Sequence, residues 1–179
     1  MAQPACIAEQ LRPLAVPVDN LQPDPENANR GDVPAIRRSL NAFGQRKPVV
    51  VKRTGTDAQG RPTGVVIAGN HTFLAALDLG WTEVAAVFTD DDAMTARAYA
   101  LADNRTGELA SWDQEQLAAH LRELNGSGVD MSSLGWTDAE LAKLLGDPGD
   151  LTAFKEYDEG AAEGVKTVEC PECGHEFAP

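Results

Sequence analysis

The chain has 179 residues, of which 42% are hydrophobic and 24% charged, a composition typical of a globular protein with one core of moderate size. Its 15 basic and 28 acidic residues give a net charge of -13, which disfavours binding to DNA through phosphate contacts without excluding it. No apolar run approaches the roughly 20 residues that cross a bilayer, and the N-terminus lacks a signal-peptide pattern. We therefore expect a cytoplasmic protein that does not associate with membranes.

The first third of the chain alternates apolar and polar segments. Residues 14–18 predict a short strand, and residues 22–32, rich in Pro, Asn and Asp, predict a loop. Apolar residues then recur at three- and four-residue steps from Val33 to Phe43. This spacing predicts an amphipathic helix, closed by Gly44 as its C-terminal cap.

Two β-branched runs follow, at residues 48–52 and 65–68. They are separated by a polar segment bounded by Gly55 and Gly64, so we expect a hairpin with a long tip. The second run leads through the single glycine Gly69 into a segment of helical pattern that ends at Gly80.

The junction at Gly69 is the most informative stretch of the chain. It places free backbone N–H groups, the imidazole of His71 and the hydroxyl of Thr72 at the start of a helix. A helix N-terminus carries unpaired donors and partial positive charge, which suit a phosphate or another anion. We therefore predict an anion site here.

The rest of the globular part continues the alternation. Residues 81–88 predict a strand, and the alanine-rich segment 93–102 predicts a helix, after which residues 103–107 form a polar junction. A further helix is expected over residues 112–124.

The segment that follows residue 110 is helical in pattern and short. Either Ser111 or Asp113 caps the helix expected over residues 112–124. A last helix is expected from Thr137 to Leu145, where Thr137 and Glu140 have capping-box spacing.

The character of the sequence changes beyond Gly146, where acidic residues and glycines predict a flexible linker. We divide the chain into an N-terminal extension, a main domain, a helical extension, a linker and a tail. These span residues 1–13, 14–110, 111–146, 147–166 and 167–179.

Taken in order, the motifs of the main domain resemble the ParB/sulfiredoxin-like family, which includes ParB N-terminal and "ParB-like nuclease" domains. The resemblance covers roughly residues 16–112, more than half of the chain. The motifs are the proline-rich entry loop, Phe43-Gly44-Gln45, Pro48-Val49-Val50-Val51, Gly69-Asn70-His71-Thr72, Leu79-Gly80-Trp81 and Asp103-Asn104-Arg105.

This resemblance implies a small α+β domain with a mixed sheet, here followed by short helices and a flexible tail. Members of the ParB type bind cytidine triphosphate with Mg²⁺, members of the sulfiredoxin type use ATP to repair an over-oxidised cysteine, and others are described as nucleases. Stand-alone copies occur in phages and mobile elements, and we expect this chain to be of that type.

The residues of the glycine turn depart from both branches of the family. Asn70 stands where sulfiredoxins have their nucleophilic cysteine, and an amide cannot attack a phosphoryl group as a thiolate does. We therefore expect no sulfiredoxin activity. ParB-type members carry consecutive arginines in this turn, which the chain lacks. His71, Thr72 and the backbone N–H groups are the donors that remain for a phosphate.

The resemblance also implies a partner for the turn. In ParB-type proteins the later motif, matched by Asp103-Asn104, touches the metal and the phosphates, which suits a hard carboxylate oxygen for Mg²⁺ and an amide donor for phosphate oxygen. Arg105 could supply the positive charge missing at Thr72. The expected set is Gly69, Asn70, His71, Thr72, Asn104 and Arg105 for the nucleotide phosphates and Asp103 for Mg²⁺.

Structural roles remain open for the same residues. Asp103-Asn104 could cap a helix end, Arg105 could be a surface cation, and His71 could serve only in capping or packing. The sequence offers no second histidine near His71, so it names no catalytic acid or base.

The tail carries a separate signal, since Cys170 and Cys173 form a C-x-x-C pair followed by His175. Such a pair is half of a zinc knuckle, and a closed structural site needs four ligands. We predict zinc binding by these three residues. The shell would be completed by the distant Cys6, by a second tail in a homodimer or by a partner protein. Alternatively, the knuckle is vestigial.

Two functions therefore remain. The first is a DNA-associated, ParB-like nuclease-domain protein that binds a nucleotide, CTP or ATP, through the glycine turn; whether it acts as a triphosphatase or nuclease is left open. The second is a non-catalytic adaptor with a degenerate pocket and a zinc-binding tail. The acidic charge and the missing arginines favour the second, whereas the intact glycine turn and Asp103-Asn104 favour the first.

Overall fold

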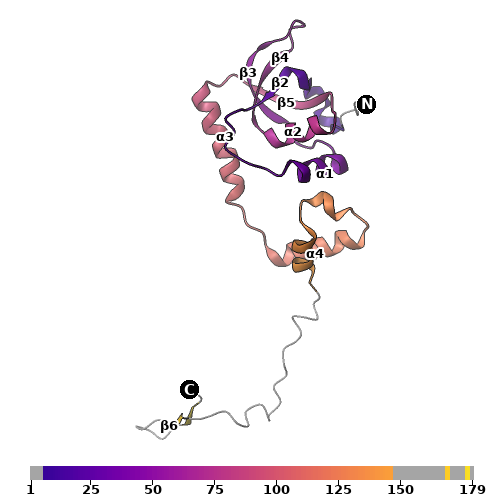
Figure 1. Ribbon diagram of the computed structural model, residues 1–179, viewed down its shortest axis with the longest axis vertical. Helices are drawn as coiled ribbons and strands as arrows, with labels where there is room; N and C mark the ends of the chain where they lie inside the picture. Colours follow the sequence, from indigo (N-terminus) through magenta and orange to yellow (C-terminus); the bar gives the residue numbers. More distant parts are fainter. Residues whose placement is uncertain (1–5, 147–167, 170–175, 178–179) are drawn as a thin grey trace. The chain divides into compact units, whose positions relative to one another are not determined.

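The computed structural model describes residues 6–146, 168–169 and 176–177 (Figure 1). Its contacts divide the chain into a unit of residues 1–145 and a unit of residues 146–179, and each is described by itself. None of the helices within these described ranges combines the length and the apolar character that a membrane crossing requires.

The first unit contains a five-stranded sheet, and the mixed sheet that the resemblance implied is confirmed, whereas β2 was not predicted as a strand. Its strand order is β1-β5-β3-β4-β2. The pairs β3–β4 and β1–β5 are antiparallel, and the pairs β3–β5 and β2–β4 are parallel. The strands are β1 (Ala15–Pro17), β2 (Leu21–Pro23), β3 (Val49–Thr56), β4 (Pro62–Ala68) and β5 (Glu83–Thr89).

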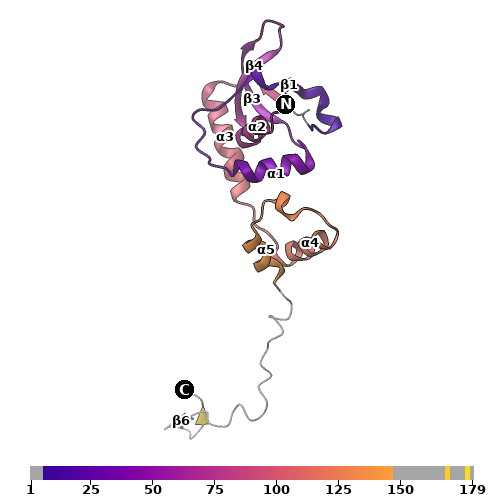
Figure 2. The same cartoon turned by 45° about the vertical axis from the view of Figure 1, so that its right-hand side comes forward.

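Helices α1 and α2 lie side by side below the sheet in both views, and α3 packs against β4 (Figures 1 and 2). The α-helices are α1 (Val33–Phe43), α2 (Asn70–Asp78), α3 (Ala93–Glu108), α4 (Gln114–Gly126) and α5 (Asp138–Leu145). Three 3-10 helices, η1 (Glu9–Leu14), η2 (Val18–Asn20) and η3 (Met131–Leu134), were not predicted.

Helix α2 is held tightly against the sheet. Its residues Phe73, Ala75 and Ala76 are at most 1% exposed and pack in the main core with valines of β3, β4 and β5. The two alanines allow close approach of the helix, and the phenylalanine contributes roughly 1.5–3 kcal/mol of burial. The N-terminus of α2 is therefore fixed relative to the sheet.

The helical extension after α3 has its own small core, in which Leu117, Leu121 and Leu141 are buried. The side chain of Asp113 accepts hydrogen bonds from the first turn of α4, so Asp113 rather than Ser111 is the cap. The predicted capping box of α5 is confirmed, because Glu140 accepts from the Thr137 N–H and Thr137 accepts from the Glu140 N–H.

Several predicted boundaries shift. The first strand is shorter than predicted because the chain turns into η2 at Val18, and the predicted loop 22–32 begins only at Asp24, after β2. Pro23 is tolerated at the end of β2 because this strand lies at the sheet edge. The predicted hairpin is confirmed, but its strands extend into the expected tip, which Asp57 closes by accepting from the Arg61 N–H.

The prediction of a polar junction at residues 103–107 is wrong, because α3 continues through them to Glu108. The Asn104 amide donates to the carbonyl of Ala100, and the Thr106 hydroxyl donates to that of Ala102. These side chains satisfy carbonyls one turn back instead of competing with the helix. The alternative that Asp103-Asn104 caps a helix end is therefore also wrong.

In the second unit, strands β6 (Val168–Glu169) and β7 (Glu176–Phe177) pair antiparallel and flank residues 170–175. The predicted zinc ligands Cys170, Cys173 and His175 lie outside the described residues, as does the predicted linker 147–166.

Candidate functional site

The turn before α2 depends on Gly69. This residue has φ 83° and ψ 25°, in the left-handed region, and a Cβ built on it would lie 3.0 Å from Cγ1 of Val49. Glycine is the residue that adopts this conformation without strain. It allows β4 to pass directly into α2, so that the helix N-terminus opens at the end of the strand.

The N-terminus of α2 has no side-chain cap. By contrast, aspartates cap α1, α3 and α4, each accepting from N–H groups of the first helical turn. The early N–H groups of α2 have no intrahelical partner, so they form a set of donors with partial positive charge.

The glycine turn and the middle of α3 line one hollow. Its volume is about 210 Å³. The lining residues come from the loop before α1, from α1, from β4, from the start of α2 and from α3. They are Asn27, Ile36, Ile67, Ala68, Gly69, Asn70, His71, Thr72, Asp103 and Asn104. The structure thus brings the two sequence motifs together.

Thr72 and Asp103 are the polar groups left free in this hollow. Among the residues that the structure describes, neither side chain has a hydrogen-bond or ion-pair partner. Both also line an adjoining hollow of about 350 Å³, together with Lys47 and Tyr99. The ammonium group of Lys47 likewise has no partner within the described ranges. Residues that carry a hydroxyl, a carboxylate and a cation therefore line one hollow.

Asn70 is engaged in the fold. It is 6% exposed, its Oδ1 accepts from the Asp24 N–H at 2.8 Å, and its Nδ2 donates to the Val66 carbonyl at 2.9 Å. A buried amide with both ends paired stabilises the local backbone. Asn70 thus fixes the loop before α1 to the end of β4.

His71 is also engaged, through its ring. Its Nε2 accepts a hydrogen bond from the Gly31 N–H at 2.9 Å. An imidazole nitrogen accepts only when it carries no proton, so this contact requires the neutral ring with its proton on Nδ1.

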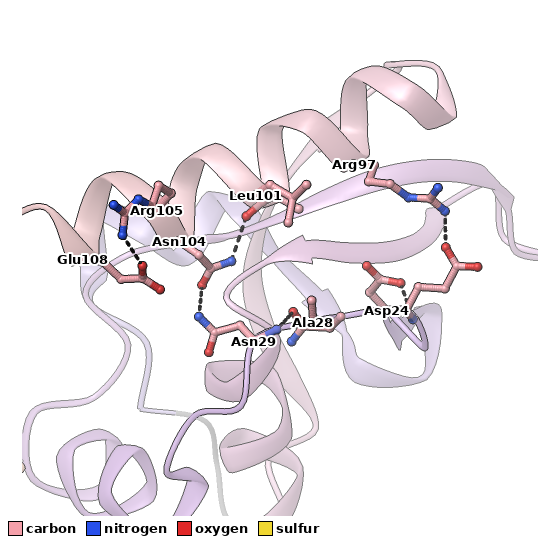
Figure 3. Close-up of a pocket in the computed structure, with 11 residues that line it drawn as sticks. Asp24, Ala28, Asn29, Arg97, Leu101, Asn104, Arg105 and Glu108 are labelled. Atoms are coloured by element: carbon pink, nitrogen blue, oxygen red, sulfur yellow. Dashed lines mark hydrogen bonds and ion pairs between the residues drawn. The ribbon is translucent and has the colours of Figure 1, made fainter.

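The remaining predicted residues of the α3 motif, Asn104 and Arg105, are both engaged in contacts within the fold. Asn104 accepts from the Asn29 Nδ2 at 2.7 Å, and Arg105 pairs with Glu108 at 2.9 Å (Figure 3). Arg105 lines a cavity of about 550 Å³ between α3 and the loop before α1, and it does not line the hollow of the glycine turn. The structure therefore does not bring Arg105 to Thr72.

Helix α3 is anchored by its own cap. The N–H of Thr95 donates to Asp92 and, together with the N–H of Met94, holds the pKa of this carboxyl below its ordinary value. The ionised cap also suits the positive end of the helix dipole.

The fit of Mg²⁺ can be judged from the donor set. No group of three or more His, Cys, Asp or Glu residues that could hold a metal occurs among the described residues. One carboxylate, that of Asp103, lines the hollow beside the donors of α2. This set fits Mg²⁺ that brings its own waters and phosphate oxygens, and it does not fit a metal held by protein ligands alone.

Sequence reasoning missed Lys47 and the loop residues Asn27 and Asn29 as parts of this region. Lys47 lies outside the motifs of the resemblance, and residues 22–32 were predicted only as a loop. Their placement depends on contacts between distant segments, such as Asn29 with Asn104, which no local pattern encodes.

Comparisons with known proteins identify the fold. No protein-family model and no curated protein matches the sequence. The chain is similar to the C-terminally truncated chromosome-partitioning protein ParB from Caulobacter crescentus complexed with CTP-gamma-S, with a TM-score of 0.59 and 19% identity over 78% of this chain and 86% of that chain. The chain therefore has a ParB-like fold, as the motifs predicted.

Two further structures are similar over parts of their lengths. The same Caulobacter protein complexed to the centromeric parS site gives a TM-score of 0.42 and 17% identity over 74% of this chain, which spans 64% of that one. Sulfiredoxin from Arabidopsis thaliana gives a TM-score of 0.35 and 18% identity over 48% of this chain and 92% of that chain.

Proposed function

We propose that this protein is a ParB-like domain that binds a nucleoside triphosphate with Mg²⁺ at the junction of α2 and α3. The observation that carries the proposal is the shared hollow, in which the uncapped start of α2 faces the free side chains of Thr72 and Asp103. The similar Caulobacter structure is a complex with a cytidine triphosphate analogue, which supports the choice of ligand class.

Each group has a distinct role in the proposal. The N–H groups of α2 and the hydroxyl of Thr72 donate to phosphate oxygens, as in other helix N-termini that bind phosphate. Asp103 is a carboxylate, so it would repel the phosphates unless Mg²⁺ lies between them. Lys47, at the adjoining hollow, supplies a positive charge that the turn itself lacks. Binding is expected to be weak because no arginine lies in the turn.

Isothermal titration calorimetry with CTP, ATP and GTP tests the proposal. We expect Mg²⁺-dependent binding of at least one nucleotide, which the double variant His71→Ala, Asp103→Ala weakens. The matched control is Asp78→Ala, which removes a carboxylate from the exposed C-terminal end of α2. Absence of heat with all three nucleotides would contradict the proposal.

Asp103 gives a sharper form of the same experiment. If the carboxylate acts through Mg²⁺, Asp103→Asn weakens binding when Mg²⁺ is present and does not weaken it when Mg²⁺ is removed, because a repulsive charge has then been lost. Weakening of equal size under both conditions would contradict the role assigned to the metal.

Association with DNA is a further part of the proposal. It is supported by the similarity to a chromosome-partitioning protein and by the exposed basic residues Arg37, Arg46 and Lys47. Because the net charge is -13, affinity is expected to be low and to fall steeply with salt. Electrophoretic mobility shifts with and without Mg-CTP, over a series of salt concentrations, measure this.

A non-catalytic adaptor is the second candidate, and the exposed apolar residues around α3 favour it. Met94, Leu101, Leu109 and Trp112 are 71%, 58%, 66% and 65% exposed. Exposed large apolar side chains are candidates for contact with another protein. Under this reading no nucleotide binds, and the calorimetric titration separates the two candidates.

Zinc binding by the tail remains a prediction from the sequence. Metal analysis of the purified protein, with and without Cys170→Ser, tests it. Zinc bound in near-stoichiometric amount by the wild type and lost from the variant is the expected result. An unchanged zinc content would contradict the knuckle.

A further inference from the structure

The loop of residues 24–32, here called the strap, crosses from β2 to α1 beside the hollow. None of its residues is buried. Besides the cap that Asp32 forms on α1, four polar contacts attach it to the unit, two to α2 and two to α3. These join Asp24 to Asn70, Gly31 to His71, Glu26 to Arg97 and Asn29 to Asn104.

A cavity lies between the strap and α3. The residues that line the cavity of about 550 Å³ include Arg97, which pairs with Glu26, and Asn104, which accepts from Asn29; Figure 3 shows Arg97 and Asn104 on α3. The side chains of Glu26 and Arg97 are 68% and 58% exposed, so water screens their pairing. Little apolar contact opposes separation of the strap from α3.

On the α2 side the strap meets the ring of His71. A Cβ built on Gly31 would lie 2.7 Å from Nδ1 and 2.8 Å from Cγ of this ring. The absence of a side chain at position 31 therefore permits the close approach that lets the Gly31 N–H donate to Nε2. The glycine is needed for proximity and not for an unusual backbone angle.

We propose that the strap is a latch on the phosphate site, and that its closed position and a bound phosphate compete for Nε2 of His71. The inference rests on the proposed function, because it concerns the regulation of that same site. While Nε2 accepts from Gly31, it cannot donate to an anion. Donation needs release of the strap and the tautomer with its proton on Nε2, and that change adds no net charge to the ring.

The other charged groups near the His71 ring do not replace it as a hydrogen-bond donor to an anion. Asp103 on α3 lines the same hollow and repels an anion, whereas Arg30 and Asp32 flank Gly31 on the strap. Helix α1 contributes the apolar Ile36 to the lining. The closed strap thus withholds Nε2 of the imidazole as a donor, whereas the Nδ1–H group and the Thr72 hydroxyl stay available in the closed position.

Two variants separate loss of the contact between Gly31 and His71 from loss of the phosphate donor. Gly31→Ala places a methyl group against the ring, which breaks the contact but keeps the donor. His71→Ala breaks the same contact and removes the donor. Gly126→Ala is the control, because Gly126 lies at the end of α4 with nothing within 4 Å of an added Cβ.

The first readout is amide hydrogen exchange of the strap, measured by mass spectrometry without any ligand. We expect faster exchange over residues 24–32 in both Gly31→Ala and His71→Ala, and unchanged exchange in Gly126→Ala. Exchange equal to that of the wild type in both variants would overturn the latch, whatever the protein binds.

The second readout is calorimetric titration with inorganic triphosphate and Mg²⁺. Gly31→Ala is expected to bind triphosphate about threefold to tenfold more tightly than the wild type. In this variant the phosphate no longer competes with the closed position of the strap. His71→Ala is expected to bind more weakly. Equal or weaker binding by Gly31→Ala would overturn the competition.

The two readouts distinguish failure of the latch from failure of the proposed function. If neither triphosphate nor a nucleotide binds to any variant, both the proposed function and the competition between strap and phosphate are contradicted. Faster strap exchange in the two variants would then still uphold the attachment of the strap through His71, and unchanged exchange would overturn it.

Discussion

Helix α2 and the strap both line the same hollow, but they are held in different ways. The wall formed by α2 is anchored by the buried residues Phe73, Ala75 and Ala76. The strap contributes no buried residue and is attached by polar side-chain contacts. The comparison indicates that the start of α2, the proposed phosphate site, is fixed by the core, whereas the strap beside it is held only by polar contacts.

Replacing Phe73 by alanine is expected to have the largest effect on stability, and it tests how firmly α2 is packed in the core. Phe73 is 1% exposed in the main core, so Phe73→Ala is expected to lower the free energy of unfolding by about 3–5 kcal/mol. Chemical denaturation measures the change. Leu101→Ala, at a site 58% exposed on α3, is the control and should change stability by no more than about 0.5 kcal/mol. Similar losses in both variants would contradict the packing described for α2.

Replacing Gly69 by alanine tests the turn itself. The positive φ and the approach to Val49 predict a loss of roughly 1–2 kcal/mol in the free energy of unfolding. Thermal and chemical denaturation measure it.

The matched control is Gly107→Ala. Gly107 lies inside α3, where an added Cβ meets nothing within 4 Å, so this variant should be neutral or stabilised by up to about 1 kcal/mol. A loss as large as that of Gly69→Ala would show that the turn has no special requirement for glycine.

The cap of α3 predicts a dependence on pH. The folded state lowers the pKa of Asp92 below its ordinary value of 3.8, so the stabilisation is complete above that value and is lost as the pH falls below it. Denaturation curves between pH 5 and pH 2 are expected to show a steeper decline for the wild type than for Asp92→Asn. Identical declines would contradict the role of the ionised cap.

The strap predicts the smallest effect on overall stability. Asn29→Ala removes the hydrogen bond to Asn104, and we expect a change within about 0.5 kcal/mol in the free energy of unfolding but faster amide exchange over residues 24–32. Asn41→Ala, on the exposed face of α1, is the control. A large global loss would place the strap among the fixed parts of the fold.

Elements governed by local rules were predictable from the sequence. The helix closed by Gly44, the hairpin of β3 and β4 and the start of α2 at Gly69 follow from hydrophobic period and glycine position. The mixed sheet followed from the order of motifs. Helix α3 was predicted too short because polar residues were read as a break, although Asn104 and Thr106 satisfy the helix backbone themselves.

The site was predictable in its location and not in its internal contacts. The meeting of Gly69 and Thr72 with Asp103 was expected from the resemblance, and the structure places these residues in one hollow. That Asn70 and His71 hold the strap could not be read from the sequence, because each contact joins segments about forty residues apart. Such contacts depend on tertiary packing, which no local pattern specifies.

The most direct test of the central claim is a nuclear magnetic resonance titration of the labelled protein with Mg²⁺ and CTP. We expect the largest chemical-shift changes at the backbone amides of residues 69–72 and at Asp103, with smaller changes along the strap as it releases Gly31. Changes confined to other surfaces, or no changes at all, would contradict a phosphate site at the start of α2.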